Sequence, residues 1–309
     1  MRKFTMFFMS SLICLCGCFT ACSGNSDDNG EEPDNGEVTG PITLTVDKAK
    51  IEANGTDMAT FTVTDANGKV LTTSEYMKNV YFEDVTTGDY LERRTNTFSA
   101  VEKVEELMPG RMVKMAFHSS SSSATDPFHL SQTSTIMGRF GASGFPTCIY
   151  DLKVMSIDRN VSAIKQTLQS QIRQYPATCG IKVNTSYNSS MGEITVDAAL
   201  KSSLGGEYDL VYVLVTDGLT ASGGNETSYD YTVRAISNNY LSMSTDGRFT
   251  VSANEEHTAA TFSISNAKNL NPATSRVVVY ALRKVDDAYM VDNITECSIN
   301  GSIDYLYND

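Results

Sequence analysis

The chain has 309 residues, of which 41% are hydrophobic and 20% are charged, a composition that is ordinary for a globular protein. Its formal net charge of −13 disfavours a nucleic-acid partner, because such binding depends on lysine and arginine contacts to phosphate. The same charge disfavours adsorption of the folded body to anionic lipid surfaces. The length suggests about two or three domains.

Residues 1–21 have the pattern of a bacterial export signal. Arg2 and Lys3 precede an apolar run that is shorter than the roughly 20 residues a membrane-spanning helix needs. The segment FTAC then resembles a bacterial lipobox, although Phe19 stands where leucine is usual. We therefore predict a lipoprotein signal peptide over 1–21 and acylation of Cys22, which would anchor the chain in the lipid of the outer membrane. An ordinary signal peptide that is cleaved elsewhere is the alternative.

Residues 22–40 form an acidic segment. SGNSDDNGEEPDNGEVTG contains six acids, no base and almost no apolar side chain, so it cannot bury enough surface to order itself. We predict a disordered tether after the lipidated cysteine. An acidic run at this place also resembles the surface-export signal of Bacteroidetes lipoproteins, whereas the alternative is a plain solvated spacer. The orientation of the anchored chain, toward the periplasm or the cell surface, stays open.

Residues 41–78 predict an immunoglobulin-like β segment. ITLTV and ATFTVTD alternate apolar and polar residues, and two Asn-Gly pairs signal hairpins or turns. The segment resembles the first strands of bacterial immunoglobulin-like domains, which need about 100 residues in full. Residues 79–100 have two interpretations. They continue this sheet as a hairpin, or they open the next unit as a strand, a loop and a helix.

Residues 79–176 predict a thioredoxin-like α/β domain. TFSAVEKVEELMPG has helical spacing of apolar residues, RMVKMAFH is a buried strand, and Asp126 with Pro127 is a well-placed helix start. GASGFPTCIYDL returns to a strand, and DRNVSAIKQTLQSQIRQYP has one apolar helical face. This order predicts a mixed sheet covered by helices.

Residues 177–309 predict a C-terminal antiparallel β-sandwich. The segments are short, rich in valine, isoleucine and tyrosine, and separated by turn residues, as in YDLVYVLVTDG and SRVVVYALRK. The whole chain is therefore predicted to be an α+β multidomain protein.

Taken in order, these segments resemble the outer-membrane-protein-28-related lipoproteins of Bacteroidetes. The matching stretches are AVEKVEELMPGRMVKMAFHS, DPF, FGASGFPT and, more weakly, YDYTVRAISNN. Members with a full thioredoxin motif carry C-x-x-C where the first helix begins, and one thiolate is activated there. In this chain Tyr90 and Arg93 stand about where the two cysteines would, so C-x-x-C dithiol chemistry is excluded. The resemblance therefore implies a degenerate member of the family.

Phe145, Pro146 and Thr147 are the candidate binding residues. In thioredoxin-like folds the backbone beside this proline, whose preceding bond the resemblance implies to be cis, pairs with an extended peptide. The turn is therefore compatible with peptide binding by strand addition. The alternative is that the turn only shapes the entry to the strand.

Three cysteines follow Cys22, and none of them has C-x-x-C spacing. Cys148 is either a lone redox thiol or a buried inert one, and burial is the commoner state of free cysteine. Cys179 and Cys297 are the pair that we would test first for a disulfide in an exported protein.

The three histidines do not have the spacing of a compact metal motif. His118 and His129 could approach Asp126 near a serine-rich loop, and His257 lies far along the chain. We expect no metal site and no cofactor.

We therefore predict a non-enzymatic outer-membrane lipoprotein that binds an unidentified protein, peptide or glycan. Two alternatives stay open: a thiol-dependent oxidoreductase that uses Cys148, and a structural component of a surface assembly.

Overall fold

The structure is a computed structural model. It describes residues 42–46, 61–64, 70–71, 76–86, 91–120, 126–157, 160–221, 228–285 and 288–308. The predicted signal peptide, Cys22, the predicted tether and Tyr90 lie outside these residues. Among the residues that the structure describes, no helix combines the length and the apolar character that crossing a membrane requires.

The N-terminal strands form a small antiparallel sheet. Strands β1 (Thr43–Val46), β2 (Phe61–Thr64) and β3 (Val70–Leu71) pair in that order. The side chains of β1 are exposed. The strands expected in this segment are therefore confirmed for these residues, while their immunoglobulin-like character stays a prediction.

The next segment alternates strands and helices. Its strands pair in the order β5-β4-β6-β7; β4 is parallel to β5 and antiparallel to β6, and β6 is antiparallel to β7. Because a strand followed by a helix occupies 80–107, the hairpin interpretation of 79–100 is wrong. The elements are β4 (Val80–Thr86), α1 (Leu91–Leu107), β5 (Met112–His118), α2 (Gln132–Phe140), β6 (Thr147–Tyr150), β7 (Val154–Ser156) and α3 (Val161–Gln174).

Local sequence signals explain the ends of two helices. The Asn160 side chain accepts a hydrogen bond from the Ala163 N–H at 2.9 Å and so caps α3. Gly141 ends α2 in the left-handed region, with φ at 61°. The expected helix start at Asp126 and Pro127 is wrong, because α2 begins at Gln132. The Asp126 carboxylate is hydrogen-bonded to the His118 ring and to a backbone N–H of the preceding turn.

The remainder of the chain consists of strands and one short 3₁₀ helix among the described residues. Two sheets result: a five-stranded sheet in the order β13-β9-β8-β17 with β14 also on β9, and a larger one that includes β16-β15-β10-β11 with β12 also on β10. The elements are β8 (Cys179–Asn188), β9 (Glu193–Ser202), β10 (Gly206–Thr216), β11 (Thr232–Ile236), β12 (Phe249–Val251), β13 (Glu256–Thr258), β14 (Phe262–Ile264), η2 (Pro272–Thr274), β15 (Ser275–Val285), β16 (Ala288–Ser298) and β17 (Ser302–Ile303).

One nine-stranded sheet connects the two segments. Strand β11 pairs in parallel with β5, with Thr232 opposite Ala116, and the Ala116 N–H donates to the Tyr231 carbonyl at 2.7 Å. The sheet therefore runs without interruption from β16 to β7, across the residue 176/177 boundary that the sequence patterns indicated.

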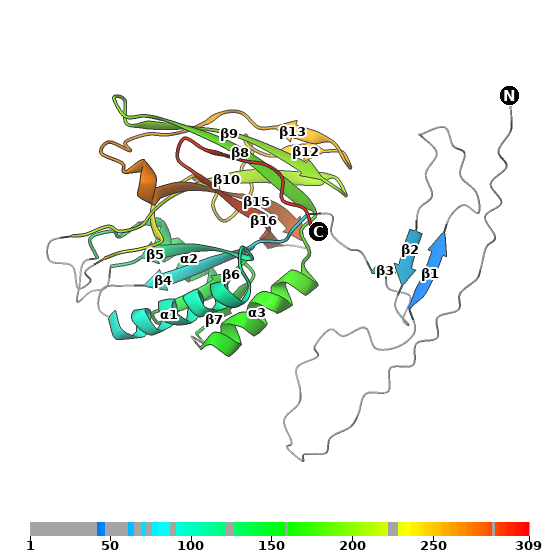
Figure 1. The fold of residues 1–309 in the computed structure, drawn as a ribbon, viewed down its shortest axis with the longest axis horizontal. Helices are drawn as coiled ribbons and strands as arrows, with labels where there is room; N and C mark the ends of the chain where they lie inside the picture. Colours follow the sequence, from blue (N-terminus) through cyan, green and yellow to red (C-terminus); the bar gives the residue numbers. More distant parts are fainter. Residues whose placement is uncertain are drawn as a thin grey trace, which may run out of the picture. The chain divides into compact units, whose positions relative to one another are not determined.

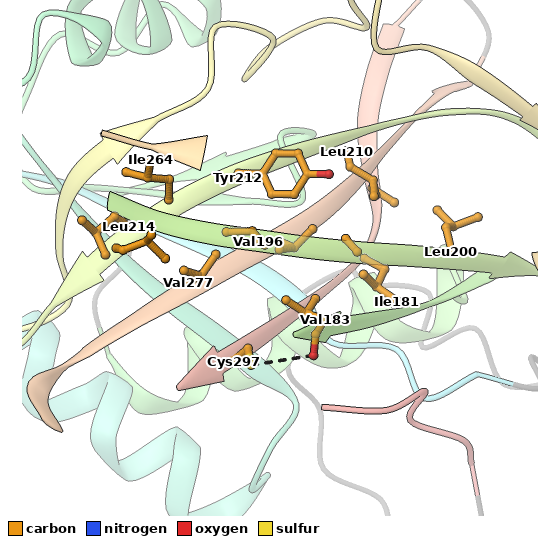
Figure 2. Close-up of a cluster of buried hydrophobic side chains, with 14 of the residues drawn as sticks. Ile181, Val183, Val196, Leu200, Leu210, Tyr212, Leu214, Ile264, Val277 and Cys297 are labelled. Carbon is orange, nitrogen blue, oxygen red and sulfur yellow. Dashed lines mark hydrogen bonds between the residues drawn. The ribbon is translucent and has the colours of Figure 1, made fainter. Parts of the chain in front are cut away.

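Three hydrophobic cores fill the space between the layers of helices and sheets, and Figure 1 shows how these layers are arranged. Helices α1 and α3 cover one face of the β4–β7 strands and bury side chains such as Leu168. A second core, with Phe117 and Tyr280, packs α2 and β5 against β10, β15 and β16. The third core lies between β10 and β15 on one side and β8 and β9 on the other, and Figure 2 shows Val196 and Val277 within it.

The segment that leads into β4 lies beside the last described residues. Tyr76 forms an isolated antiparallel bridge with Tyr307, and their rings stack with centroids 5.3 Å apart. The Met77 N–H donates to the Leu306 carbonyl at 2.9 Å. The entry of the chain into this body and its C-terminal segment are thus hydrogen-bonded to each other.

Candidate functional site

The residues that the sequence singled out gather where β4 and β5 end and β6 begins. In the β4–β5 register Thr86 lies opposite His118, and in the β4–β6 register Val85 lies opposite Thr147. The end of β4, the end of β5 and the turn before β6 therefore lie together, where these strands end or begin. We call the set His118, Asp126 and Gly144–Thr147 the turn edge.

The candidate binding residues are mostly turned inward. The Phe145–Pro146 bond is cis, as the resemblance implied. Pro146 and Thr147 are buried, and Phe145 is half-buried against the second core. The Thr147 hydroxyl donates to the Gly144 carbonyl at 2.7 Å, which closes the turn on itself. The side chains of this turn therefore mainly contact the protein's own core and the turn itself.

The position expected for a redox pair holds no sulfur. Helix α1 begins at Leu91, so Arg93 lies in its first turn, and Tyr90 falls outside the described residues. Thiolate chemistry at a helix start needs cysteine, which the sequence lacks from 87 to 98.

Cys148 lies inside the sheet. It sits on β6 opposite Asp84 of β4 and Ser156 of β7, its side chain is 0% exposed, and it is not in a disulfide. Reactive cysteines are partly exposed, whereas buried structural ones are inert. The geometry therefore favours the inert interpretation of Cys148.

Cys179 and Cys297 are not brought together. Both are free thiols, and the Cys297 Sγ lies 3.8 Å from the Val183 carbonyl oxygen. Val183 is four residues further along β8 than Cys179, or about 13 Å at the rise of a β-strand. A disulfide requires Cα atoms within about 7 Å, so the expected pairing is wrong for this fold.

Burial keeps both of these thiols protonated. It raises the pKa of Cys179 well above the ordinary thiol value, and the charge of Asp292 and a hydrogen bond to that carboxylate raise it further. Burial likewise raises the pKa of Cys297. Neither has the lowered pKa of a nucleophilic cysteine.

A buried His–Asp pair lies at the end of β5. His118 Nδ1 and Asp126 Oδ2 are 2.8 Å apart, and both side chains are almost fully buried. Asp126 Oδ1 also accepts from the Phe128 N–H at 2.8 Å. The rings of Phe128 and Tyr229 lie beside the imidazole, with centroids 6.1 and 5.6 Å from its own. The pair joins the turn that begins at Asp126 to the end of β5.

The other histidines have separate surroundings. His129 Nδ1 accepts from the Ser120 N–H at 3.1 Å, and His257 stacks on Phe249 in the sandwich. Among the described residues no three histidine, cysteine, aspartate or glutamate side chains are grouped so that they could hold a metal ion.

A buried polar cluster, which the sequence gave no signal for, joins the two segments of the nine-stranded sheet. We call Lys78, Asn79, Asp151, Asp292 and Asn293 the junction network. Lys78 Nζ lies 3.2 Å from Asp151 Oδ2 and donates to the Asp292 carbonyl at 2.6 Å. Asn293 Oδ1 accepts from the Asn79 N–H at 3.0 Å.

The Asp292 carboxylate is the centre of the junction network. Its Oδ2 accepts from the N–H groups of Thr178 and Cys179 at 2.8 and 3.0 Å, and its Oδ1 lies 3.3 Å from Arg283 Nε. Asp292 itself is 2% exposed. A buried charge with this many partners fixes the start of β8 against β16.

The fold is similar to those of several solved structures. The chain is similar to HBP35 of Porphyromonas gingivalis, with a TM-score of 0.56 and 15% identity, over 74% of this chain and 77% of that one. It is also similar to protein AGR_C_4864 from Agrobacterium tumefaciens, with a TM-score of 0.49 and 13% identity, over 75% of this chain and 97% of that one.

No protein-family model matches the chain, and no curated protein matches it either. The likeness to HBP35 at 15% identity therefore shows a shared mixed α/β fold and nothing about activity.

Proposed function

We propose that this protein is a cell-envelope lipoprotein, anchored in the outer membrane through Cys22, whose thioredoxin-like domain over 79–176 is catalytically inactive. In this proposal the thioredoxin-like unit and the β-sandwich act together as a binding or interaction module, and the chain is a degenerate member of the outer-membrane-protein-28-related lipoproteins.

The sheet order supports the thioredoxin-like assignment. A parallel β4–β5 pair joined through a helix, followed by antiparallel β6 and β7, gives the order β5-β4-β6-β7. Helices α1 and α3 lie on one face, and α2 packs on the other. The turn at Pro146 precedes the strand that pairs with β4, which is where such folds place the proline that faces their cysteines.

The observation that carries the inactive assignment is the position of sulfur. The start of α1 has no cysteine, and Cys148, Cys179 and Cys297 are 0%, 0% and 2% exposed. A dithiol cycle needs two accessible thiols, one of which must be a good thiolate at ambient pH. None of these three thiols is accessible to a substrate disulfide.

The envelope assignment rests on the N-terminal sequence and on the fold. Arg2, Lys3, the short apolar run and FTAC are the features of a lipoprotein signal. The fold shared with HBP35 of P. gingivalis, a Bacteroidetes species, agrees with the family resemblance.

A labelling experiment tests the anchor. Cells that express the full chain are fed an alkyne analogue of palmitate, fractionated, and compared with cells that express Cys22→Ala. We expect label and membrane association in the first and neither in the second. Equal labelling of both, or an unlabelled soluble chain, would contradict the anchor.

A turnover assay tests the missing redox activity separately. The purified full chain is given insulin and dithiothreitol, or hydrogen peroxide and a thiol donor, beside its Cys148→Ser variant. We expect both proteins to match the background rate. A rate above background that Cys148→Ser abolishes would establish the oxidoreductase alternative.

Crosslinking on intact cells separates the other two functions, a structural component of a surface assembly and a binding module. Crosslinks only between copies of this chain indicate a surface assembly, and crosslinks to a different molecule indicate a binding module.

A further inference from the structure

A groove of about 620 Å³ opens on one side of the β-sandwich. It lies between the first half of β10, the connection from β11 to β12, and the β13–β14 segment, and we call it the sandwich groove. Its volume lies within the range of about 300–1,000 Å³ that is typical of ligand pockets.

The groove forms where strand pairing is interrupted in both sheets. β12 pairs with residues 206–208 of β10 and β11 with residues 213–216, so residues 209–212 lack a strand partner on that side among the described residues. In the other sheet β13 pairs with residues 199–201 of β9 and β14 with residues 194–196. The side chains at these breaks line a hollow instead of continuing a sheet.

Two stacked aromatic pairs line the sandwich groove. Tyr212 and Phe262 stack with ring centroids 4.4 Å apart and an interplanar angle of 6°. Phe249 and His257 stack at 3.9 Å and 11°. Phe249, His257 and Phe262 are half-buried, so parts of these rings remain on the groove surface. Such surfaces favour a ligand with an apolar face.

Two nearly buried polar groups in the groove have an unused hydrogen-bonding atom. Tyr212 is 6% exposed, and among the described residues nothing is hydrogen-bonded to its hydroxyl. Asp209 is 2% exposed, and its Oδ2 accepts from the Ser244 N–H and hydroxyl, while its Oδ1 has no donor in the described part of the chain. Neither atom is fully enclosed by the described residues, so each lies at the groove surface, where a ligand can hydrogen-bond to it.

The space beside Asp209 Oδ1 depends on a glycine. A Cβ on Gly247 would lie 2.8 Å from that oxygen, closer than real Cβ contacts occur. Gly247 therefore leaves room next to the carboxylate oxygen that lacks a protein donor.

The charges of the groove select against anionic ligands. Asp209 and Asp246 both line it, while its one arginine, Arg248, lies 3.9 Å from Glu207 outside the groove. Burial raises the pKa of the Tyr212 hydroxyl, and the charges of Asp209 and Asp197 raise it further. The hydroxyl therefore stays protonated and is a donor, whereas the carboxylate is only an acceptor.

We infer that the sandwich groove binds a neutral carbohydrate. A sugar ring presents C–H faces to Phe249 and Phe262, an oxygen that accepts from the Tyr212 hydroxyl, and a hydroxyl that donates to Asp209 Oδ1. This inference deepens the proposed binding function and rests on it, since it assigns the ligand class and places the site in the sandwich instead of at the turn edge.

Saturation-transfer NMR on the purified full chain tests the inference. The probes are maltotriose, cellotriose, mannotriose and triacetylchitotriose, each at millimolar concentration. We expect transfer to at least one of them and a Kd about tenfold weaker in Tyr212→Phe, which loses one hydrogen bond of about 1.4 kcal/mol. Phe249→Ala is expected to weaken the same sugar by at least as much.

The matched control is Tyr187→Phe. It also removes one tyrosine hydroxyl, which donates to the Ala267 carbonyl at 2.8 Å away from the groove, and it should leave the Kd unchanged. Circular dichroism verifies that each variant is folded. Binding of no sugar, equal binding by wild type and both groove variants, or binding of a basic tripeptide such as Lys-Gly-Lys in place of the sugars would overturn the inference. None of these results bears on the lipid anchor or the redox assay.

Discussion

The turn edge and the sandwich groove differ in whether their polar atoms have hydrogen-bond partners within the chain. At the turn edge the Thr147 hydroxyl, the Asp126 carboxylate and the His118 carbonyl all have partners within the chain. In the groove Tyr212 and Asp209 each keep an atom without one among the described residues. The difference shows that the residues which the sequence singled out are bonded within the fold, whereas the polar atoms that stay available for a ligand lie in a groove that no sequence motif marked.

Replacement of Asp292 by alanine is expected to have the largest effect, because its carboxylate is the centre of the junction network that joins the two segments of the nine-stranded sheet. It removes the carboxylate that lies beside Arg283 and leaves the N–H groups of Thr178 and Cys179 without an acceptor. We expect a loss of about 3–5 kcal/mol in the free energy of unfolding, measured in urea. A loss below about 1 kcal/mol would show that other contacts hold the two segments of the sheet together.

Asp126→Ala tests the turn edge alone. It removes the partner of a fully buried imidazole and the acceptor for the Phe128 N–H, so we expect a loss of about 3 kcal/mol in the free energy of unfolding. Sugar binding in the groove should not change. Weaker binding by the folded variant would show that the two regions are coupled.

The buried thiol of Cys179 predicts a pH dependence of stability. Its pKa is higher in the folded than in the unfolded chain, so the unfolded state loses the proton first as the pH rises above about 8.5. The contribution is fully present below that pH and is lost as the pH rises through the folded pKa. We expect the stability of the wild type to fall by up to about 1.4 kcal/mol per pH unit from this group between pH 9 and 10, and Cys179→Ala to flatten the slope. Identical slopes would mean that the thiol ionises in the folded state as well.

Thr147→Val keeps the shape of the side chain but removes the bond to Gly144. We expect a loss of about 1 kcal/mol, read from urea unfolding, and no change in any binding activity. If this variant instead abolishes capture of an extended peptide while stability is unchanged, the turn edge is a binding site after all.

The smallest effect is expected for the stability of Tyr212→Phe. The hydroxyl makes no hydrogen bond with the described residues, so its removal should alter the free energy of unfolding by less than about 0.5 kcal/mol while weakening sugar binding. A large loss of stability would show that the hydroxyl has a structural partner and would undo the contrast between the two regions.

Local sequence signals predicted most of the elements. Apolar spacing located α3, where Ile164 and Leu168 are buried, and alternation located the long strands β8 to β10. These signals work because they depend only on neighbours along the chain. The predicted start of α2 was wrong because the Asp126 carboxylate is hydrogen-bonded to His118 and does not cap the helix.

Long-range pairings could not be predicted in the same way. The β11–β5 join rests on Thr232 and Ala116, and the bond from Lys78 to the Asp292 carbonyl joins residues more than 200 positions apart. The groove residues lie in separate strands and loops and have no common motif. Single sequences carry no record of such proximity, so the junction network and the sandwich groove emerge only from the fold.

The bridge between Tyr76 and Tyr307 has a mechanical consequence. If the N-terminus is held at a membrane, any pull on the body enters at Tyr76 and is resisted first by the Met77–Leu306 hydrogen bond and the Lys78 contacts to β16. The load is thereby spread into the C-terminal strands before it reaches β4. A label added after residue 309 would therefore lie close to the point where the chain enters this body at Tyr76.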